Sequence, residues 1–339
     1  MNAPSPIVLS SRAEDPRVEA FVRAHPQATP FHLPQWSRAI EAGTGRRAHL
    51  LVAEAGGEVA GVLPLTEIRS RLFGSALVSA GFGVDGGILA LNDSAAHALA
   101  EQAVRLAGEL RCGAIELRGG PLPKGWHCSE GTYAGFVRDL PGDDEAILGA
   151  IPRKQRAEVR RALGFGLDVG LGDGDAHYRV YAESVRNLGT PVFPRALFDA
   201  VLAEFGADAD ILTISRDGAP LAAVLSLYFN ATVYPYWGGG TRAARDARAN
   251  ELLYYALMRH AAGKSCTRFD FGRSKAGTGA YAYKKNWGFE PRPLAYANWG
   301  KAREINPLDP KYRLKIALWR KLPLWIANRA GPMIARSLG

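Results

Sequence analysis

The residues best suited to chemistry lie in one short segment, 269–289. It begins as an apolar strand that ends on a carboxylate, Asp270. It then passes Gly272, Gly277 and Gly279, a glycine density that packed helices and strands disfavour. Tyrosines and cations follow: Arg273, Lys275, Tyr281, Tyr283, Lys284 and Lys285. The pattern indicates a site for a phosphate- or acyl-carrying ligand, and the alternative is a strand, a glycine loop and a solvated basic turn.

Acyl transfer to an amine is a reaction that this set could perform. The reaction needs a proton acceptor for the amine, a donor to the carbonyl oxygen, and a site that holds both substrates in line. No Gly-x-Ser-x-Gly motif or credible catalytic cysteine setting occurs, so we expect direct attack by the amine. Asp270 is the candidate base or amine-positioning group, and Tyr281 and Tyr283 are candidate donors to the carbonyl oxygen or the leaving group. Alternatively, Asp270 binds loop amides and the tyrosines only pack the loop.

Other residues could bind an anionic substrate. A diphosphate could be held by the four cations near the glycines, which are Arg273, Lys275, Lys284 and Lys285. Trp237 could stack on a sugar or a nucleotide base, or belong to the core. One face of a predicted helix after Pro152 carries three arginines at i, i+3 and i+7, which are Arg153, Arg156 and Arg160. They form either an anion clamp between the two halves of the chain or a solvated face.

The totals describe a globular protein with a basic surface. The chain has 339 residues, of which 47% are apolar and 22% charged, and its net charge of +9 suits an anionic partner. Three cysteines and no Cys-x-x-Cys or His-x-x-x-His spacing predict a reducing compartment and no metal. We see no signal peptide and no apolar run of ~18 residues. The protein is therefore expected in the cytoplasm, with peripheral attachment to the inner face of the membrane left open.

Two parts of the chain repeat the same order of elements. Hairpins are predicted from His49 and from Asp210, where Asp217-Gly218 is a strong turn signal. Helices with apolar residues on one face follow at 94–110 and 247–262. Each helix leads into a strand, beginning at a cysteine in both cases. The repetition favours two units of the α/β class, which we place at residues 1–150 and 151–300.

The remaining segment, 301–339, is a basic amphipathic tail. A turn is expected at 306–310, after which leucines and tryptophans alternate with lysines and arginines. Tryptophan with cations on short apolar helices is typical of elements that lie on a membrane surface. A C-terminal helix that packs on the core, with solvated cations, is the alternative.

Several motifs together resemble a known family. They are Phe31-His-Leu-Pro-Gln-Trp36, Asp270-Phe-Gly-Arg-Ser-Lys275, Tyr283-Lys-Lys-Asn-Trp-Gly-Phe289 and Asn306-Pro-Leu-Asp-Pro-Lys-Tyr-Arg313. They resemble the FemAB-like proteins associated with the exosortase/PEP-CTERM system, within the GNAT-like, Fem-type transferases. The resemblance runs from about Thr29 to Gly339. It implies a tandem pair of GNAT-like domains, each a mixed, mostly antiparallel sheet flanked by helices.

The resemblance also implies a function. Fem-type enzymes transfer an aminoacyl group from aminoacyl-tRNA to an amine of a peptidoglycan precursor, and other GNAT-like relatives use acyl-coenzyme A. The donor stays open between these two, and tRNA is not favoured because the long coiled-coil hairpin of some tRNA-dependent relatives is missing. Asn250 resembles an asparagine at the start of the central helix. Lys284 and Lys285 resemble a segment in which a lysine meets substrate phosphate.

The expected function is therefore that of an acyl- or aminoacyltransferase. Its acceptor would be an amine of a phosphate-bearing or lipid-linked sugar or peptide precursor in envelope or exopolysaccharide synthesis. The expected partners are that substrate and, as an open possibility, an anionic membrane surface. The alternative is a non-catalytic, membrane-peripheral binding protein with a degenerate GNAT pair.

Overall fold

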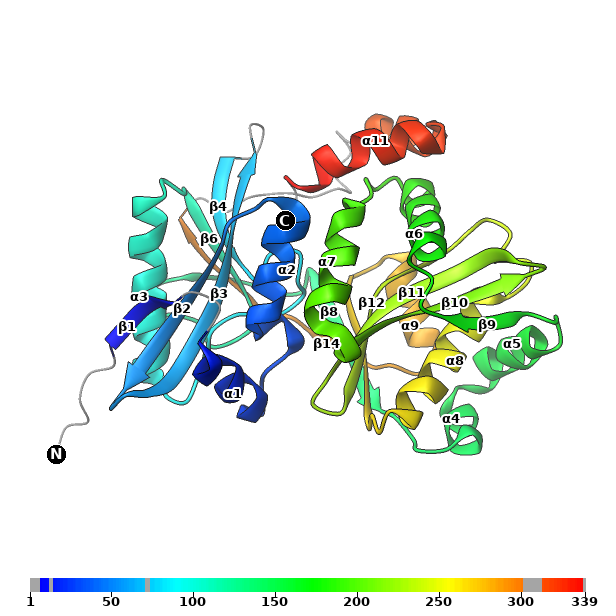
Figure 1. Cartoon of the computed structure of the whole chain (residues 1–339), viewed down its shortest axis with the longest axis horizontal. Coiled ribbons are helices and arrows are strands. Elements are labelled where there is room, and N and C mark those ends of the chain that lie inside the picture. The colour runs from blue at the N-terminus through cyan, green and yellow to red at the C-terminus, as the bar shows by residue number, and fades with distance from the viewer. Residues whose placement is uncertain (1–6, 12–14, 71–73, 301–312, 338–339) are drawn as a thin grey trace.

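The computed structural model describes residues 7–11, 15–70, 74–300 and 313–337, arranged as two sheets with helices around them (Figure 1). The first sheet has the strand order β1 (Ile7–Ser11), β2 (Ala48–Ala55), β3 (Glu58–Ser70), β4 (Gly74–Ser79), β6 (Ala114–Arg118), β15 (Tyr296–Gly300) and β7 (His127–Ser129), with β5 (Leu89–Ala90) paired to β3. The second has the order β14 (Pro291–Pro293), β8 (Tyr133–Asp139), β13 (Arg268–Lys275), β12 (Thr232–Gly240), β11 (Ala219–Phe229), β10 (Ala209–Arg216) and β9 (Asp168–Leu171).

The helices cover these sheets and the region between them. They are α1 (Pro16–Ala24), η1 (Pro30–His32), α2 (Pro34–Thr44), α3 (Asp93–Glu109), α4 (Asp144–Ala150), α5 (Arg153–Leu163), α6 (Gly174–Leu188), α7 (Arg195–Phe205), η2 (Gly206–Asp208), α8 (Ala249–Gly263), α9 (Gly279–Asn286), α10 (Arg313–Lys321) and α11 (Leu324–Ala335). The two helices predicted at 94–110 and 247–262 correspond to α3 and α8.

The two units repeat one topology, which confirms the predicted fold class. Each begins with an antiparallel hairpin, β2–β3 or β10–β11. The second hairpin turns at Asp217 and Gly218, whose φ angles of 51° and 76° suit a tight turn. A third antiparallel strand follows, β4 or β12, and then the helix α3 or α8. The next strand pairs parallel to the third one, as β4–β6 and β12–β13.

The units exchange one strand each. β8 comes before residue 150 in the sequence but pairs with β13 of the second sheet. β15 comes late in the 151–300 segment but pairs with β6 of the first sheet. The expected boundary at residue 150 lies between α4 and α5, and these two strands cross it in opposite directions. Backbone hydrogen bonds therefore tie each unit to the other half of the chain.

A shared apolar core lies between the units. α2 of the first unit and α7 of the second lie side by side (Figure 1), and a Cβ on Gly43 would come within 2.3 Å of the Leu197 Cα. Trp36 is fully buried there, and its ring stacks on Trp237 at a centroid distance of 5.9 Å. Its indole N–H donates to the Gly81 carbonyl at 3.2 Å. The tryptophan of the Phe31–Trp36 motif is thus a core residue that joins both units.

The C-terminal tail forms α10 and α11, which lie along α6 (Figure 1). The turn expected at 306–310 lies outside the described residues. In the part of the chain that the structure describes, no helix is long and apolar enough to cross a membrane.

Candidate functional site

The site is built where two parallel strands separate. β12 and β13 pair only at Thr232–Val233 and Arg268–Phe269. Beyond this point β13 has an irregular register between Asp270 and Arg273, and it continues along β8 on its other side. After Val233 and Phe269, β12 and β13 therefore no longer pair with each other. Bulges of this kind often redirect side chains next to active sites.

Asp270 and Lys284 both bind Gly272, which lies within the bulge. The Asp270 carboxylate accepts a hydrogen bond from the Gly272 N–H at 2.8 Å. The Lys284 ammonium donates to the carbonyls of Gly272 at 3.2 Å and Arg273 at 2.9 Å. Because both groups bind the same residue, the carboxylate and the ammonium lie at most about 10 Å apart. An ammonium has three donors, so one N–H of Lys284 is left for a ligand.

The segment that carries Lys284 is a short helix. The glycines predict a flexible loop, but α9 begins at Gly279, two residues after Gly277, which has a φ of 76°. Thr278 caps this helix, because its hydroxyl accepts from the Tyr281 N–H at 3.3 Å. The glycines therefore provide a sharp turn into a helix, and that turn brings Lys284 back toward β13.

Partial burial shifts the pKa values of Asp270 and Lys284 toward 7. Burial raises the pKa of Asp270 to about 6, and the Gly272 N–H and the Lys284 charge limit the rise. Burial lowers the pKa of Lys284 to about 7, although the Asp270 carboxylate opposes this change. A carboxylate and an amine that both titrate near pH 7 can exchange protons with a substrate at physiological pH.

A second carboxylate comes from the first unit. Asp85 follows β4 in a glycine-rich loop, and its carboxylate lies against Gly119. Burial raises the pKa of Asp85 to about 7, and the nearby charge of Asp270 adds to the rise, while Arg273 and Arg118 oppose it. Within the described chain, no hydrogen bond to the Asp85 side chain is found. Asp85 is therefore an acid available to a ligand beside Asp270.

Two arginines, Arg273 and Arg118, lie near these acids. Arg273 donates to the Tyr296 hydroxyl, and its guanidinium lies 4.6 Å from the ring centre of Tyr133. Arg118 binds Glu116 at 2.7 Å and the Gly83 carbonyl at 2.8 Å. Arg273 thus links a strand of the second sheet to β15 of the first, next to Asp270.

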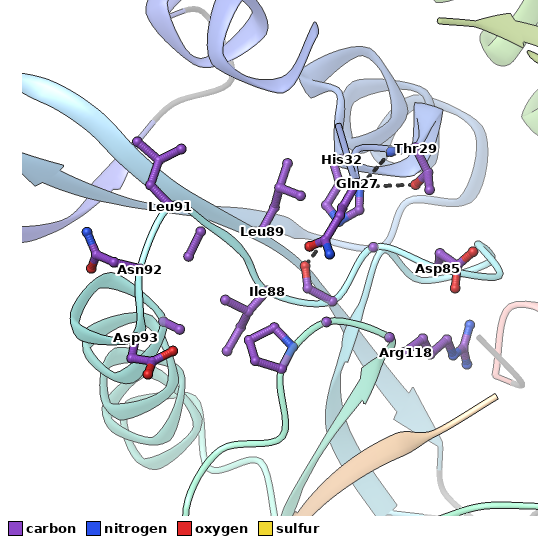
Figure 2. Close-up of a pocket in the computed structure, with 17 residues that line it drawn as sticks. Gln27, Thr29, His32, Asp85, Ile88, Leu89, Leu91, Asn92, Asp93 and Arg118 are labelled. Carbon is purple, nitrogen blue, oxygen red and sulfur yellow. Dashed lines mark hydrogen bonds between the residues drawn. The ribbon is translucent and has the colours of Figure 1, made fainter. Parts of the chain in front are cut away.

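A cavity of about 620 Å³ in the first unit ends at Asp85. Figure 2 shows Asp85 and Arg118 together at one end of this cavity and Asn92 and Asp93 at the other. The walls approach closely, because a Cβ on Gly87 would lie 1.9 Å from the Gly119 carbonyl oxygen. Both polar and apolar side chains line the cavity, and Asp85 at its end is close enough to Asp270 of the second unit for the two charges to interact.

Sequence reasoning missed Asp85, Arg118 and the cavity. A lone aspartate among glycines at 81–87 is a weak signal. Its importance depends on Asp270, which is 185 positions away in the chain.

The other candidates of the 269–289 segment are placed differently. Tyr281 packs edge-on against Phe136, with ring centres 5.3 Å apart. The Tyr283 hydroxyl is buried among aromatic rings in the core of the second unit. Lys275 is half-buried at the end of β13, and Lys285 is exposed on α9. The structure brings Asp270, Arg273 and Lys284 together, and the roles of the remaining four stay predictions.

The candidates outside that segment are more scattered. Arg156 donates to the Gly149 and Ile151 carbonyls at the end of α4. Arg153 and Arg160 are exposed on α5, which lies on the side of the second sheet away from the first (Figure 1). Their position does not support a clamp between the units, and their binding of anions stays a prediction.

Trp237 and Asn250 lie at the two ends of the path from β12 to α8. Trp237 is only 4% exposed, and it packs on Trp36 and Phe198 in the shared core. Asn250 lies in the first turn of α8, with its amide against the Gly240 backbone. Trp237 therefore belongs to the core in this structure, and a role of either residue in binding stays a prediction. Over the described ranges, no group of three His, Cys, Asp or Glu side chains could hold a metal.

Comparisons with known proteins agree with this architecture. Residues 151–285 match the family model described as Acetyltransferase (GNAT) domain. A tandem GNAT protein from the clavulanic acid biosynthesis pathway superposes with a TM-score of 0.56 at 15% identity, over 87% of this chain and 98% of that one. The fold is a tandem pair of GNAT-like domains.

Two further structures share this tandem fold. FemX superposes with a TM-score of 0.69 at 17% identity, over 91% of this chain and 99% of FemX. The C-terminal domain of a putative lysylphosphatidylglycerol synthetase from Agrobacterium fabrum gives a TM-score of 0.59 at 14% identity, over 86% and 93% of the two chains. Identities this low show the shared fold alone. No curated protein sequence matches the chain.

Proposed function

We propose that this protein is an N-acyltransferase that moves an acyl or aminoacyl group to an amine of a phosphate-bearing or lipid-linked sugar or peptide precursor. The observation that supports this most is the pair Asp270 and Lys284, both held on Gly272 and both with a pKa near neutrality. A GNAT acetyltransferase domain covers the segment that contains this pair. The motifs quoted above support a place in envelope or exopolysaccharide synthesis, of the exosortase/PEP-CTERM-associated type.

The geometry supports direct transfer. The acceptor amine attacks the acyl carbonyl carbon, and its proton passes to the Asp270 carboxylate. Lys284 uses two of its N–H groups on backbone carbonyls, so the third can stabilise the developing oxyanion or a substrate phosphate. The tetrahedral intermediate then expels the thiolate of coenzyme A or the ribose hydroxyl of tRNA, and the proton on Asp270 neutralises that leaving group. Each of these steps uses groups near Gly272.

The first unit would hold the acceptor. Its cavity ends at Asp85, whose carboxylate can bind an ammonium group and direct it toward Asp270. Acyl-coenzyme A is the donor favoured by the GNAT domain, and aminoacyl-tRNA remains the second choice. A lipid-linked acceptor is supported by the name of the lysylphosphatidylglycerol synthetase domain, which shares the fold.

Release of free thiol from acetyl-coenzyme A, measured with a panel of phosphate-bearing amino sugars and amino-peptides, tests the proposal. The wild type should release thiol with at least one acceptor. Asp270→Asn should lower turnover by ~10²–10⁴-fold and leave donor binding largely unchanged, because it removes the base and keeps the shape. Asp246→Asn, the same change at an exposed position before α8, is the matched control and should keep full activity.

The same experiment distinguishes the non-catalytic alternative. That alternative predicts that the wild type binds the phosphate-bearing compounds, measured by calorimetry, without any transfer from acetyl-coenzyme A or from aminoacyl-tRNA. It also predicts that Asp270→Asn weakens the binding of these compounds, because Asp270 would then act in binding only.

A further inference from the structure

The two C-terminal helices expose an unusual amount of apolar surface. Of the twelve large apolar side chains exposed among the described residues, five lie in α10 and α11. They are Leu314 (72% exposed), Leu318 (58%), Trp325 (71%), Met333 (68%) and Ile334 (45%). Scattered single side chains of this kind are ordinary, but a concentration within two short helices marks an interaction surface.

Four of the five exposed apolar side chains, all except Ile334, lie on one face of their helix. In α11, Trp325, Arg329 and Met333 follow each other at intervals of four residues and lie on the outer side. Ala327 and Gly331 lie on the opposite side and are buried, and Gly331 lies against Val192 of the body. In α10, Leu314, Leu318 and Lys321 form the outer stripe at i, i+4 and i+7. We call these two stripes the outer face.

The inner side of the same helices is fixed to the protein body. Arg320 donates to the Leu188 carbonyl at 3.2 Å, and Arg186 of α6 donates to the Arg320 carbonyl at 3.2 Å. Arg46 of the first unit donates to the Arg336 carbonyl at 2.9 Å. Both units therefore hold α10 and α11 in place. The outer face is exposed to solvent without any change in the fold.

The charge of this tail identifies the partner. Residues 311–339 contain seven lysines and arginines and no aspartate or glutamate, against a net charge of +9 for the whole chain. A membrane surface with anionic headgroups attracts such cations, while the apolar boundary below the headgroups accepts leucine, methionine and tryptophan. A second copy of this chain would bring two strongly basic faces together, which is electrostatically unfavourable.

We propose that the outer face of α10 and α11 docks the protein on an anionic lipid bilayer. Trp325, Leu318 and Met333 enter the headgroup boundary, and Lys321 and Arg329 bind the phosphates around them. The docking uses no residue of the proposed transferase site, so it stands or fails independently of that function. It would bring the protein to the surface where lipid-linked acceptors reside.

Co-sedimentation of the full-length protein with phosphatidylcholine vesicles, with and without phosphatidylglycerol, tests this proposal. The wild type should bind the anionic vesicles, should bind the neutral ones much less, and should be released by salt. Trp325→Ser should weaken binding to anionic vesicles by about tenfold, because burial of one large apolar side chain is worth about that factor. Lys321→Glu should weaken it by a smaller factor at low salt, and this difference should vanish at high salt.

Leucine substitutions provide a matched control. Leu318 on the outer face and Leu171 on the edge strand β9 are both 58% exposed. Leu318→Ser should weaken vesicle binding, and Leu171→Ser should not. Circular dichroism spectra and melting temperatures equal to those of the wild type confirm that each variant is folded.

Three results would overturn the proposal. The first is equal binding of wild type and Trp325→Ser to anionic vesicles. The second is equal binding of the wild type to neutral and anionic vesicles. The third is the absence of vesicle binding combined with a wild-type dimer that Trp325→Ser dissociates, measured by light scattering, because the outer face would then bind a second copy.

Discussion

Asp270→Asn should lower the pKa of Lys284 further below its present value of about 7. Burial depresses the pKa of this lysine, and the Asp270 carboxylate partly offsets the depression. The two groups lie at most about 10 Å apart, since both bind Gly272. At an effective dielectric constant of about 20, a unit charge within this distance contributes at least about 1.7 kcal/mol, or about one pKa unit. The variant should therefore titrate Lys284 near pH 6.

Competitive labelling with acetic anhydride measures this change without any knowledge of the substrate. Only the neutral amine reacts, so the labelled fraction of Lys284, read by mass spectrometry of peptides across a pH series, follows its titration. At pH 7 the neutral fraction should rise from about one half in the wild type to about nine tenths in Asp270→Asn. Lys285 is the next residue and is exposed, so it serves as the internal reference for reagent concentration.

Two outcomes would refute the reasoning. A wild-type midpoint near 10.5, the ordinary pKa of lysine, would show that Lys284 is not buried in this way. An unchanged midpoint in Asp270→Asn would show that the carboxylate does not act on the ammonium. Asp246→Asn, which removes an exposed carboxylate, should leave the Lys284 titration as it is in the wild type.

Further predictions concern activity and stability. In the thiol-release assay, kcat/KM should rise through about pH 6 as Asp270 loses its proton, and it should fall above about pH 7 as Lys284 loses its proton. Lys284→Arg should remove the fall at alkaline pH. A profile that is flat from pH 5 to 8 would contradict both roles. Because the folded-state pKa of Lys284 lies below 10.5, the unfolded chain binds more protons above pH 7, so the free energy of unfolding should rise with pH from there. Urea denaturation at several pH values should show a smaller rise for Lys284→Met. Trp36→Ala should cost ~3–5 kcal/mol in urea denaturation, because it empties the centre of the shared core, and a cost below ~1 kcal/mol would contradict that position. Gly87→Ala should cost ~1–3 kcal/mol because its methyl group would meet the Gly119 carbonyl, whereas Gly108→Ala, which meets open space in α3, should gain up to ~1 kcal/mol.

Much of the fold follows from local patterns in the sequence. Apolar residues at helical spacing fixed α3 and α8 to within one or two residues, because a helix buries one face whatever lies opposite it. The Asp217-Gly218 turn placed the β10–β11 hairpin, because its backbone requires positive φ angles that this pair tolerates. Repetition of these local signals was sufficient to predict a tandem α/β fold.

Some local signals were incomplete. The glycines at 277 and 279 predict a loop, but Thr278 between them caps α9, and this cap decides the conformation. The sequence leaves two roles for Trp237, stacking on a ligand and packing in the core. Its burial depends on Trp36, which lies 201 positions earlier in the chain, so no local pattern could decide it.

Only the tertiary structure decided which distant segments meet. Strand signals give no pairing partner, so the exchange of β8 and β15 between the sheets could not be predicted. The same exchange and the shared core bring Asp85 to Asp270. The pKa values of Asp85, Asp270 and Lys284 lie between about 6 and 7 because these groups have lost water around them. This desolvation is a property of the assembled units and not of any sequence motif. The sequence determined which groups could perform acyl transfer, and the packing of the two units determined which of them are near each other and partly shielded from water.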